Sequence, residues 1–203
     1  IGKIHAENLA TRVPGAVVVA IADVDQSAAQ ALAERLHVET VYADYHDILA
    51  DKSIDAVAIC SSTDTHAKIV GEAARAGKHI FCEKPIDHDL DKIDAALKAV
   101  DDAGVKMQIG FNRRFDPNFR NVRDMVQAGK IGVPHVVRIT SRDPEPPPAK
   151  YVKASGGMFL DMTIHDFDMA RYLSGSDVVE VFAAAAVLVD PEIGKEGDVD
   201  TAV

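Results

Sequence analysis

Short runs of consecutive apolar residues recur along the first half of the chain, and each is followed by a stretch in which apolar positions repeat with helical spacing. We predict that these runs form strands at 17–22, 55–60, 78–82 and 105–109. Helices are predicted at 26–36, 45–50, 65–76 and 90–103. Strands that alternate with helices of this length form βαβ units, so the pattern predicts an α/β domain whose parallel sheet is covered on both faces.

The pattern changes after Gly110. A helix is predicted at 118–128, residues 133–141 alternate between apolar and polar like a strand with one exposed face, and 178–189 is a second long strand candidate. Long strands with a helix packed on one face are typical of an α+β domain with a largely antiparallel sheet. We therefore predict two domains, residues 1–110 and 111–203, with the boundary between 110 and 116.

Residues 156–173, between the two long strand candidates, combine apolar character with polar residues at helical spacing. On a single helix, one stripe would carry Asp161, His165, Asp168 and Tyr172. A second, purely apolar stripe of Leu160, Ile164 and Phe167 would face a core. The segment is therefore predicted to be one largely buried helix.

Asp161 and His165 lie one turn apart on this predicted helix. A buried carboxylate and a buried imidazole each need a partner or a chemical purpose. At this spacing the carboxylate can orient or charge the imidazole, which suits a general base that acts near neutral pH. A solvated Asp/His pair on a helix surface would show the same spacing, so the segment alone leaves both interpretations open.

Composition narrows the classes of protein that fit this pattern. Hydrophobic residues make up 47% of the 203 residues and charged residues 27%, which are ordinary values for a globular protein with a core. The net charge of −10 argues against nucleic acid or an anionic membrane as a partner. No apolar run approaches the length of a membrane span, and Cys60 and Cys82 lack the spacing of a disulfide framework or a zinc site. We expect a soluble cytoplasmic protein.

Asp23 follows the first predicted strand, where a dinucleotide-binding fold places an acid against the ribose hydroxyls. An acid there favours NAD, because it would repel the additional phosphate of NADP. Helix capping is the alternative role, but Asp25 is better placed to cap the next helix. The glycine-rich turn of such folds is mostly absent, and only Gly2 could be its last glycine. Ser61 and Ser62 follow a later strand, where ligands and helix caps both occur.

The Glu83-Lys84-Pro85 segment follows another buried strand. A lysine at the ligand-binding edge of a sheet needs an anionic or hydroxyl partner. Glu83 could be its ion-pair partner or a cofactor contact, and the Lys84–Pro85 bond could be cis, which would aim the ammonium group. A solvated lysine in a loop is the alternative interpretation.

Two arginines and several histidines complete the polar candidates. Arg113 and Arg114 follow the last strand of the first domain and could hold substrate hydroxyls, although at least one could form an ion pair at the domain interface. Asp166 and Asp168 beside His165 resemble a metal cluster, but no further His or Glu lies at ligand spacing, so no metal site is predicted. The other histidines share no spacing and are interpreted as structural or surface residues: His5, His37, His46, His66, His79, His88 and His135.

Taken together, five segments resemble the glucose–fructose oxidoreductase / inositol dehydrogenase (Gfo/Idh/MocA) family. They are residues 1–6 (IGKIHA), 22–25 (ADVD), 81–85 (FCEKP), 110–115 (GFNRRF) and 156–165 (GGMFLDMTIH). The similarity spans essentially the whole chain, and the order of the Glu-Lys-Pro motif and the Asp-x-x-x-His motif is specific to the family. Within the family, residues 112–116, 141–144 and 164–168 are most similar to inositol 2-dehydrogenases.

The resemblance implies an NAD-dependent oxidation of a secondary hydroxyl of a cyclic polyol to a ketone, most specifically myo-inositol to 2-keto-myo-inositol. It implies catalytic roles for three residues: His165 as the base, Asp161 as its assistant and Lys84 as hydrogen-bond donor to the reacting oxygen. The cofactor-binding candidates are Gly2, Asp23, Ser61, Ser62, Glu83 and Lys84. The substrate-binding candidates are Lys84, Arg114, Asp143, Asp161 and His165. The resemblance further implies a cytoplasmic homotetramer.

The chain departs from the family at both ends. The first strand and the first two glycines of the nucleotide-binding turn are missing, as is the end of the second domain, so we expect the chain to be part of a longer enzyme. A dehydrogenase acting on another inositol isomer, a sugar or a sugar acid is an alternative, and Arg114 and the 141–151 loop would shape that choice. A noncatalytic NAD-binding regulatory protein on the same fold is a further alternative, but it would be expected to lose Lys84 or His165, and both are present.

Overall fold

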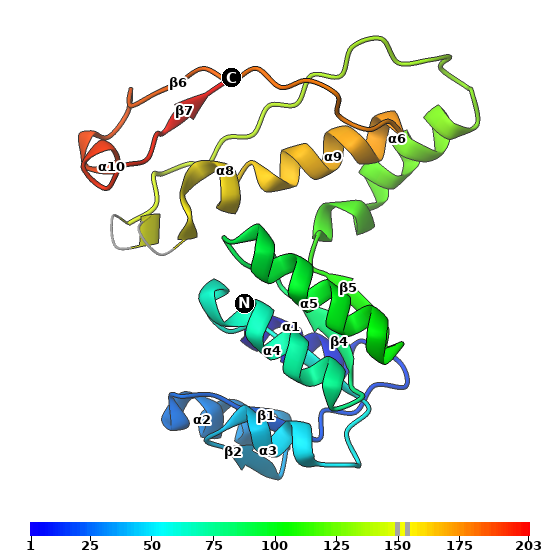
Figure 1. Cartoon of the computed structure of the whole chain (residues 1–203), viewed down its shortest axis with the longest axis vertical. Helices are drawn as coiled ribbons and strands as arrows, with labels where there is room; N and C mark the ends of the chain where they lie inside the picture. The colour runs from blue at the N-terminus through cyan, green and yellow to red at the C-terminus, as the bar shows by residue number, and fades with distance from the viewer. Residues whose placement is uncertain (149–150, 153–154) are drawn as a thin grey trace. The chain divides into compact units, whose positions relative to one another are not determined.

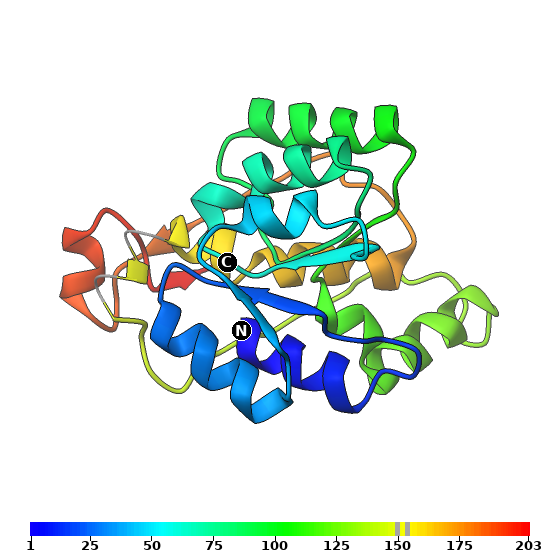
Figure 2. The same cartoon turned by 90° about the horizontal axis from the view of Figure 1, so that it is seen from below.

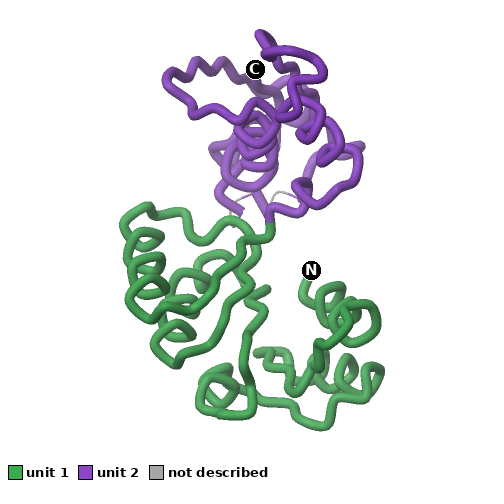
Figure 3. The backbone as a smooth tube through the Cα atoms, turned by 90° about the vertical axis from the view of Figure 1, so that its right-hand side faces the viewer, with its two compact units in different colours: residues 1–110 green, residues 111–203 purple. Residues whose placement is uncertain are grey.

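The computed structural model describes residues 1–148, 151–152 and 155–203. The chain divides into two compact units, residues 1–110 and 111–203 (Figure 3). None of the described helices is long and apolar enough to cross a membrane.

Unit 1 alternates helices and strands, as the hydrophobic pattern predicts (Figure 1). Its elements are α1 (Gly2–Thr11), β1 (Ala20–Ala22), α2 (Gln26–Leu36), β2 (Thr40–Tyr42), α3 (Tyr45–Ala50), β3 (Ala56–Ile59), α4 (Thr63–Arg75), β4 (His79–Cys82), α5 (Leu90–Ala103) and β5 (Met107–Ile109). All described strand pairs of this unit are parallel, in a two-stranded sheet β1-β2 and a three-stranded sheet β3-β4-β5. The α/β prediction is confirmed, with the strands distributed over two sheets.

The core of unit 1 lies between the three-stranded sheet and the helices α4 and α5, which pack side by side (Figures 1 and 2). Val70, Ala73 and Ala74 of α4 are fully buried, as is Cys82 of β4, and Ile80 of the same strand is nearly so. Small alanine side chains allow a helix to approach its neighbours closely, so this packing fixes α4 against the sheet. The packing of α4 thereby fixes the ends of the strands in this sheet. Candidate site residues of this unit lie just beyond these strand ends.

Unit 2 contains η1 (Asn112–Phe115), α6 (Pro117–Gln127), α8 (Gly157–Asp161), α9 (Ile164–Ser174), β6 (Ala185–Ala186), α10 (Pro191–Lys195) and β7 (Thr201–Ala202). β6 and β7 are antiparallel. The predicted strand at 133–141 is wrong, and 178–189 contributes only β6. An alternating sequence becomes a strand only when another strand pairs with its backbone, and β6–β7 is the one pair that the structure describes in this unit. The largely antiparallel sheet is therefore reduced to two short strands.

The predicted single helix at 156–173 is also wrong, because α8 ends at Asp161 and α9 begins at Ile164. At the break, the carbonyl of Met158 accepts the N–H groups of both Met162 (3.1 Å) and Thr163 (2.9 Å), which closes α8. The predicted apolar stripe is not buried either: Leu160 is 38% exposed and Phe167 53% exposed.

Asp200 organises the loop between β6 and α10. Its carboxylate accepts the backbone N–H groups of Leu188 (2.8 Å), Val189 (2.9 Å) and Asp190 (2.9 Å). These bonds, the one from Leu188 above all, favour the charged form and lower the pKa of Asp200 from 3.8 to about 2. The stabilisation is therefore fully present above the ordinary carboxyl pKa and is lost as the pH falls through about 2.

We expect the amide proton shifts of residues 188–190 to titrate together, with a midpoint near 2. The measurement is an NMR pH titration of the protein and of Asp200→Asn, in which this common titration should disappear. A midpoint at the ordinary carboxyl value of 3.8 would contradict the assignment.

Candidate active site

The ends of β3, β4 and β5 lie at one edge of the three-stranded sheet. The strand register places Ile59, Cys82 and Ile109 side by side. The residues that follow them continue the alignment, because Glu83 N–H donates to the Ile59 carbonyl (3.0 Å) and Gly110 N–H to the Cys82 carbonyl (2.8 Å). Since open parallel sheets bind ligands beyond the carboxyl ends of their strands, this edge is the candidate site of unit 1.

Helix α1 lies beside α2 and contacts β3 (Figure 2). A Cβ atom on Gly2 would lie 3.3 Å from the Cβ of Cys60, so a larger residue at position 2 would push the helix away from the end of β3. The last glycine of a dinucleotide-binding turn serves this purpose of close helix–strand packing. The predicted role of Gly2 is thus compatible with its surroundings.

The two aspartates that follow β1, Asp23 and Asp25, have different roles. Asp25 accepts the N–H groups of Ser27 (3.1 Å) and Ala28 (3.0 Å) and so caps α2, which confirms the prediction for this residue. Asp23 is exposed beyond the strand, and its Oδ1 accepts the N–H of Asp25 (2.9 Å). The cap does not use Asp23, which leaves its carboxylate at the surface for another interaction.

Ser61 and Ser62 lie between β3 and α4. Ser61 shares a hydrogen bond of 2.6 Å with the hydroxyl of Thr65. Ser62 is the N-cap residue of α4 by position, but its side chain makes no capping hydrogen bond. Helix capping therefore does not explain the hydroxyl of Ser62, and both residues stay candidates for a cofactor contact.

The partner of Glu83 is a residue that the sequence does not indicate. The Nε2 atom of His5, on α1, lies 2.6 Å from Oε1 of Glu83, and the two side chains are 27% and 14% exposed. The histidine ring also packs against Phe81, with 4.8 Å between ring centroids. The sequence carries no signal for this pair, because its members are 78 positions apart and belong to different elements.

The Lys84–Pro85 peptide bond is cis, as the sequence suggested. The buried His66 makes hydrogen bonds to the Pro85 carbonyl (2.8 Å) and the Ser61 carbonyl (3.0 Å), which confirms that it is structural. Burial raises the pKa of the Cys82 thiol to about 12 and that of the Cys60 thiol to about 11. Both thiols are therefore protonated at neutral pH and unsuited to act as nucleophiles.

In unit 2, two arginines of η1 bind two aspartates of α9. Arg113 forms an ion pair with Asp166, whose Oδ1 also accepts the hydroxyl of Ser141 (2.6 Å). Arg114 binds Asp168 through Nε (2.8 and 3.0 Å) and Nη2 (2.5 Å). The ion pair that the sequence allowed for at least one of these arginines is present for both, and it lies within this unit. These carboxylates, which superficially resemble a metal cluster in sequence, are occupied by guanidinium groups.

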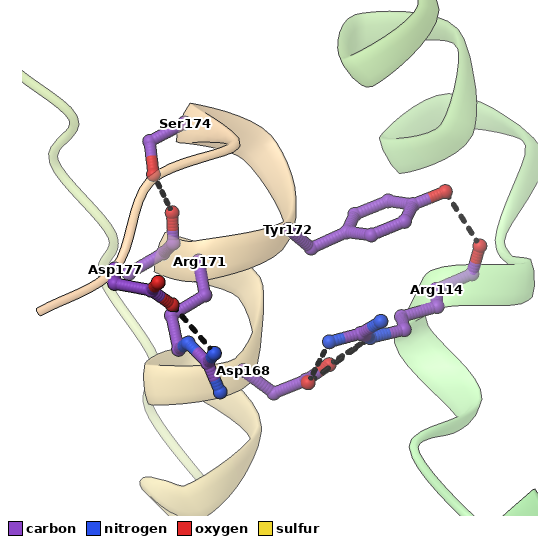
Figure 4. A network of polar contacts seen from close by, with 7 residues as sticks. Arg114, Asp168, Arg171, Tyr172, Ser174 and Asp177 are labelled. Atoms are coloured by element: carbon purple, nitrogen blue, oxygen red, sulfur yellow. Dashed lines mark hydrogen bonds and ion pairs between the residues drawn. The ribbon is translucent and has the colours of Figure 1, made fainter.

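Tyr172 reinforces the link between η1 and α9 (Figure 4). Its hydroxyl donates to the Arg114 carbonyl (3.2 Å), and the Arg114 guanidinium lies 5.2 Å from the centre of its ring. The bond to Asp168 is the main reason why the pKa of Arg114 lies above its ordinary value. If Arg114 binds substrate, as predicted, its guanidinium group must do so while it is also bonded to Asp168 of α9.

Asp161 and His165 lie on different helices, on either side of the break between α8 and α9. Tyr151 donates its hydroxyl to Oδ2 of Asp161 (2.9 Å), and partial burial together with this bond raises the pKa of Tyr151 to about 12. The His165 ring meets Phe111 edge to face, with 6.3 Å between centroids. Tyr151 and Phe111 were not among the predicted site residues. Asp143, predicted to bind substrate, lies exposed in the loop after Ser141.

Comparison with known proteins connects the two units to one family. Residues 1–111 match an oxidoreductase family described as having an NAD-binding Rossmann fold, and residues 119–203 match the GFO/IDH/MocA C-terminal domain. The chain is 54% identical over its whole length to a myo-inositol 2-dehydrogenase of Thermotoga maritima and 52% identical over 99% of its length to an inositol 2-dehydrogenase of Rhizobium meliloti. It spans about 60% of the length of each of these relatives.

Solved structures show the same similarity. A scyllo-inositol dehydrogenase from Lactobacillus casei, crystallised with bound NAD(H) and scyllo-inositol, superposes with a TM-score of 0.91 at 37% sequence identity. The superposition covers 99% of this chain and 61% of that one.

Proposed function

The chain belongs to the GFO/IDH/MocA oxidoreductase family, and from this premise we propose that it contributes to an NAD-dependent inositol 2-dehydrogenase that oxidises myo-inositol to 2-keto-myo-inositol. The identity of 54% to a myo-inositol 2-dehydrogenase over all 203 residues carries this proposal. In it, residues 1–110 bind the cofactor, and residues 111–203 contribute to substrate binding and to assembly of a homotetramer.

The residues of unit 1 fit NAD. The carboxylate of Asp23 is exposed beyond β1 and is not consumed by the cap of α2, so it can accept hydrogen bonds from ribose hydroxyls. Gly2 lets α1 approach the end of β3, and Ser61 and Ser62 place hydroxyl groups at the same strand end. An aspartate at position 23 disfavours NADP, whose 2′-phosphate it would repel.

When bound, NAD supplies the hydride acceptor. We assign the removal of the hydroxyl proton to a ring nitrogen of His165 and the orientation of that imidazole to Asp161. Asp161 is itself held by the hydroxyl of Tyr151. Lys84 is assigned the hydrogen bond to the reacting oxygen, where a cation stabilises the negative charge that develops as the proton leaves.

Scyllo-inositol is the second candidate substrate, because the structure that superposes with a TM-score of 0.91 is named for it. The two inositols differ in the configuration of one hydroxyl group, so the choice between them depends on a few polar side chains around the ring. Asp143 and its exposed loop are proposed to take part in that choice.

Activity assays on the full-length protein test both candidates. NADH formation is measured with myo-inositol, scyllo-inositol and glucose, each with NAD and with NADP. We expect turnover of myo-inositol with NAD and a large preference for NAD over NADP. Activity confined to scyllo-inositol or glucose would keep the mechanism and replace the substrate. Binding of NAD without turnover of any polyol would favour a noncatalytic NAD-binding protein on the same fold.

A further inference from the structure

Glu83 is bonded to three parts of unit 1, two of them through its carboxylate. The residue begins the loop after β4, and its backbone N–H is bonded to Ile59 at the end of β3 (3.0 Å). Its Oε1 lies 2.6 Å from Nε2 of His5, which belongs to α1. Its Oε2 accepts the backbone N–H of Lys84 (3.3 Å). The two carboxylate oxygens therefore have separate partners, one in the helix and one in the backbone of the catalytic candidate.

Gly110, just beyond β5, provides the space for this carboxylate. A Cβ atom at position 110 would lie 2.9 Å from Oε2, 3.0 Å from Cδ and 3.1 Å from Oε1 of Glu83. Contacts this short do not persist, so either the carboxylate or the strand end would have to move. The strand end is fixed by the hydrogen bond from Gly110 N–H to the Cys82 carbonyl (2.8 Å), so the carboxylate is the part that moves.

The backbone of Gly110 does not itself require glycine. Among the described residues, nine glycines have positive φ angles, where side chains are strained, and Gly110 is not one of them. The lack of a side chain at position 110 is therefore explained by space for Glu83 and not by backbone conformation. Gly110 is buried, and its backbone lies close against the Glu83 carboxylate. This close fit indicates that the placement of the carboxylate matters.

We propose that His5, Glu83 and Gly110 form a positioning device that holds the backbone of Lys84 and ties it to α1. In this device, which we call the Glu83 anchor, none of the three residues reacts; they fix the point from which the Lys84 side chain extends. The inference rests on the proposed dehydrogenase function, in which Lys84 bonds the reacting oxygen. A displacement of about 1 Å in a catalytic group can lower a rate by about a hundredfold, so the anchor would act on kcat.

A direct contact between Glu83 and the cofactor is the competing role. The two roles predict different kinetics. If Glu83 binds NAD, moving its carboxylate raises the KM and Kd for NAD. If Glu83 positions Lys84, the same movement lowers kcat and leaves NAD affinity almost unchanged.

Gly110→Ala in the full-length protein separates these roles, because it moves the carboxylate without removing any polar group. We expect kcat for inositol oxidation to fall about tenfold or more, while the Kd for NAD, measured by calorimetry, changes less than about threefold. Glu83→Asp in the Gly110→Ala background shortens the acid by one methylene group, makes room for the new methyl, and should restore part of kcat. Gly71→Ala is the matched control, since its Cβ would meet Arg75 Nη1 at an ordinary 3.4 Å.

Amide hydrogen exchange tests the anchor without any substrate. In Gly110→Ala, the Lys84 amide should exchange faster, whereas the amides of α2 should be unchanged; Gly71→Ala should alter neither. This measurement stays decisive even if the wild-type protein oxidises none of the polyols, so failure of the anchor and failure of the proposed function can be told apart. Unchanged kcat and unchanged exchange at Lys84 would overturn the proposal. A parallel loss of NAD affinity and kcat would also overturn it, in favour of the cofactor contact.

Discussion

Replacing His165 by asparagine is expected to lower kcat for inositol oxidation about a thousandfold, within the range of 10²–10⁴ that general-base catalysis supplies. Asparagine keeps a hydrogen-bonding group of similar size at the start of α9 but cannot accept the substrate proton at neutral pH. The Kd for NAD should change less than about threefold, because the predicted cofactor residues all belong to unit 1. Initial rates and cofactor calorimetry on the full-length protein measure both quantities.

His135→Asn is the matched control for this variant. His135 belongs to the same unit and is exposed, and its sequence context predicts a structural or surface residue. Its replacement should leave kcat within about twofold of the wild type, as for a surface substitution that touches no reacting group. If His165→Asn lost NAD affinity and activity in parallel, His165 would be a structural residue and the assignment of the base would fail.

Asp168→Asn should lower the free energy of unfolding by about 2 kcal/mol, which is less than the roughly 3–5 kcal/mol for breaking a fully buried pair. The Asp168 side chain is 9% exposed and accepts three hydrogen bonds from Arg114. The variant removes the charge that faces the guanidinium, but Arg114 is 41% exposed, so water compensates part of the loss. Urea unfolding followed by tyrosine fluorescence measures the change.

A second ion pair of α9, also drawn in Figure 4, provides the control for this measurement. Arg171 of the same helix pairs with Asp177 at 2.8 Å, but both side chains are exposed, at 58% and 84%. Asp177→Asn should therefore change the free energy of unfolding by less than about 0.5 kcal/mol. Equal effects of the two substitutions would mean that solvent screens the Arg114–Asp168 pair as well, and that it does not fix α9 against η1.

Helix bounds in unit 1 could be predicted from sequence because they depend on neighbouring residues. The prediction of 26–36 for α2 and of 90–103 for α5 agrees with the structure. Asp25 and Asp89 cap the two helices through residues two or three positions away, and Gly104 ends α5 with a left-handed φ of 63°. Each of these caps and helix ends involves residues within about one helical turn of each other, so the local sequence is enough to predict it.

Strands and helix breaks in unit 2 were predicted less well. Residues 133–141 have the alternation of a strand, yet strand formation depends on a partner that lies elsewhere in the chain. The break between α8 and α9 interrupts a periodicity that runs unbroken through the sequence, and it places Asp161 and His165 on separate helices. Here the local spacing predicted one continuous helix, and the folded chain divides it into two.

By itself, the sequence determined the alternation of helices and strands, the helix caps, and which polar side chains follow each strand. These features depend on residues that are close together in the chain. Tertiary structure alone decided the partners: Arg113 with Asp166 across 53 positions, and His5 with Glu83 across 78. Hydrogen bonds and ion pairs act over a few ångströms, so their members are known only once packing has brought distant elements together.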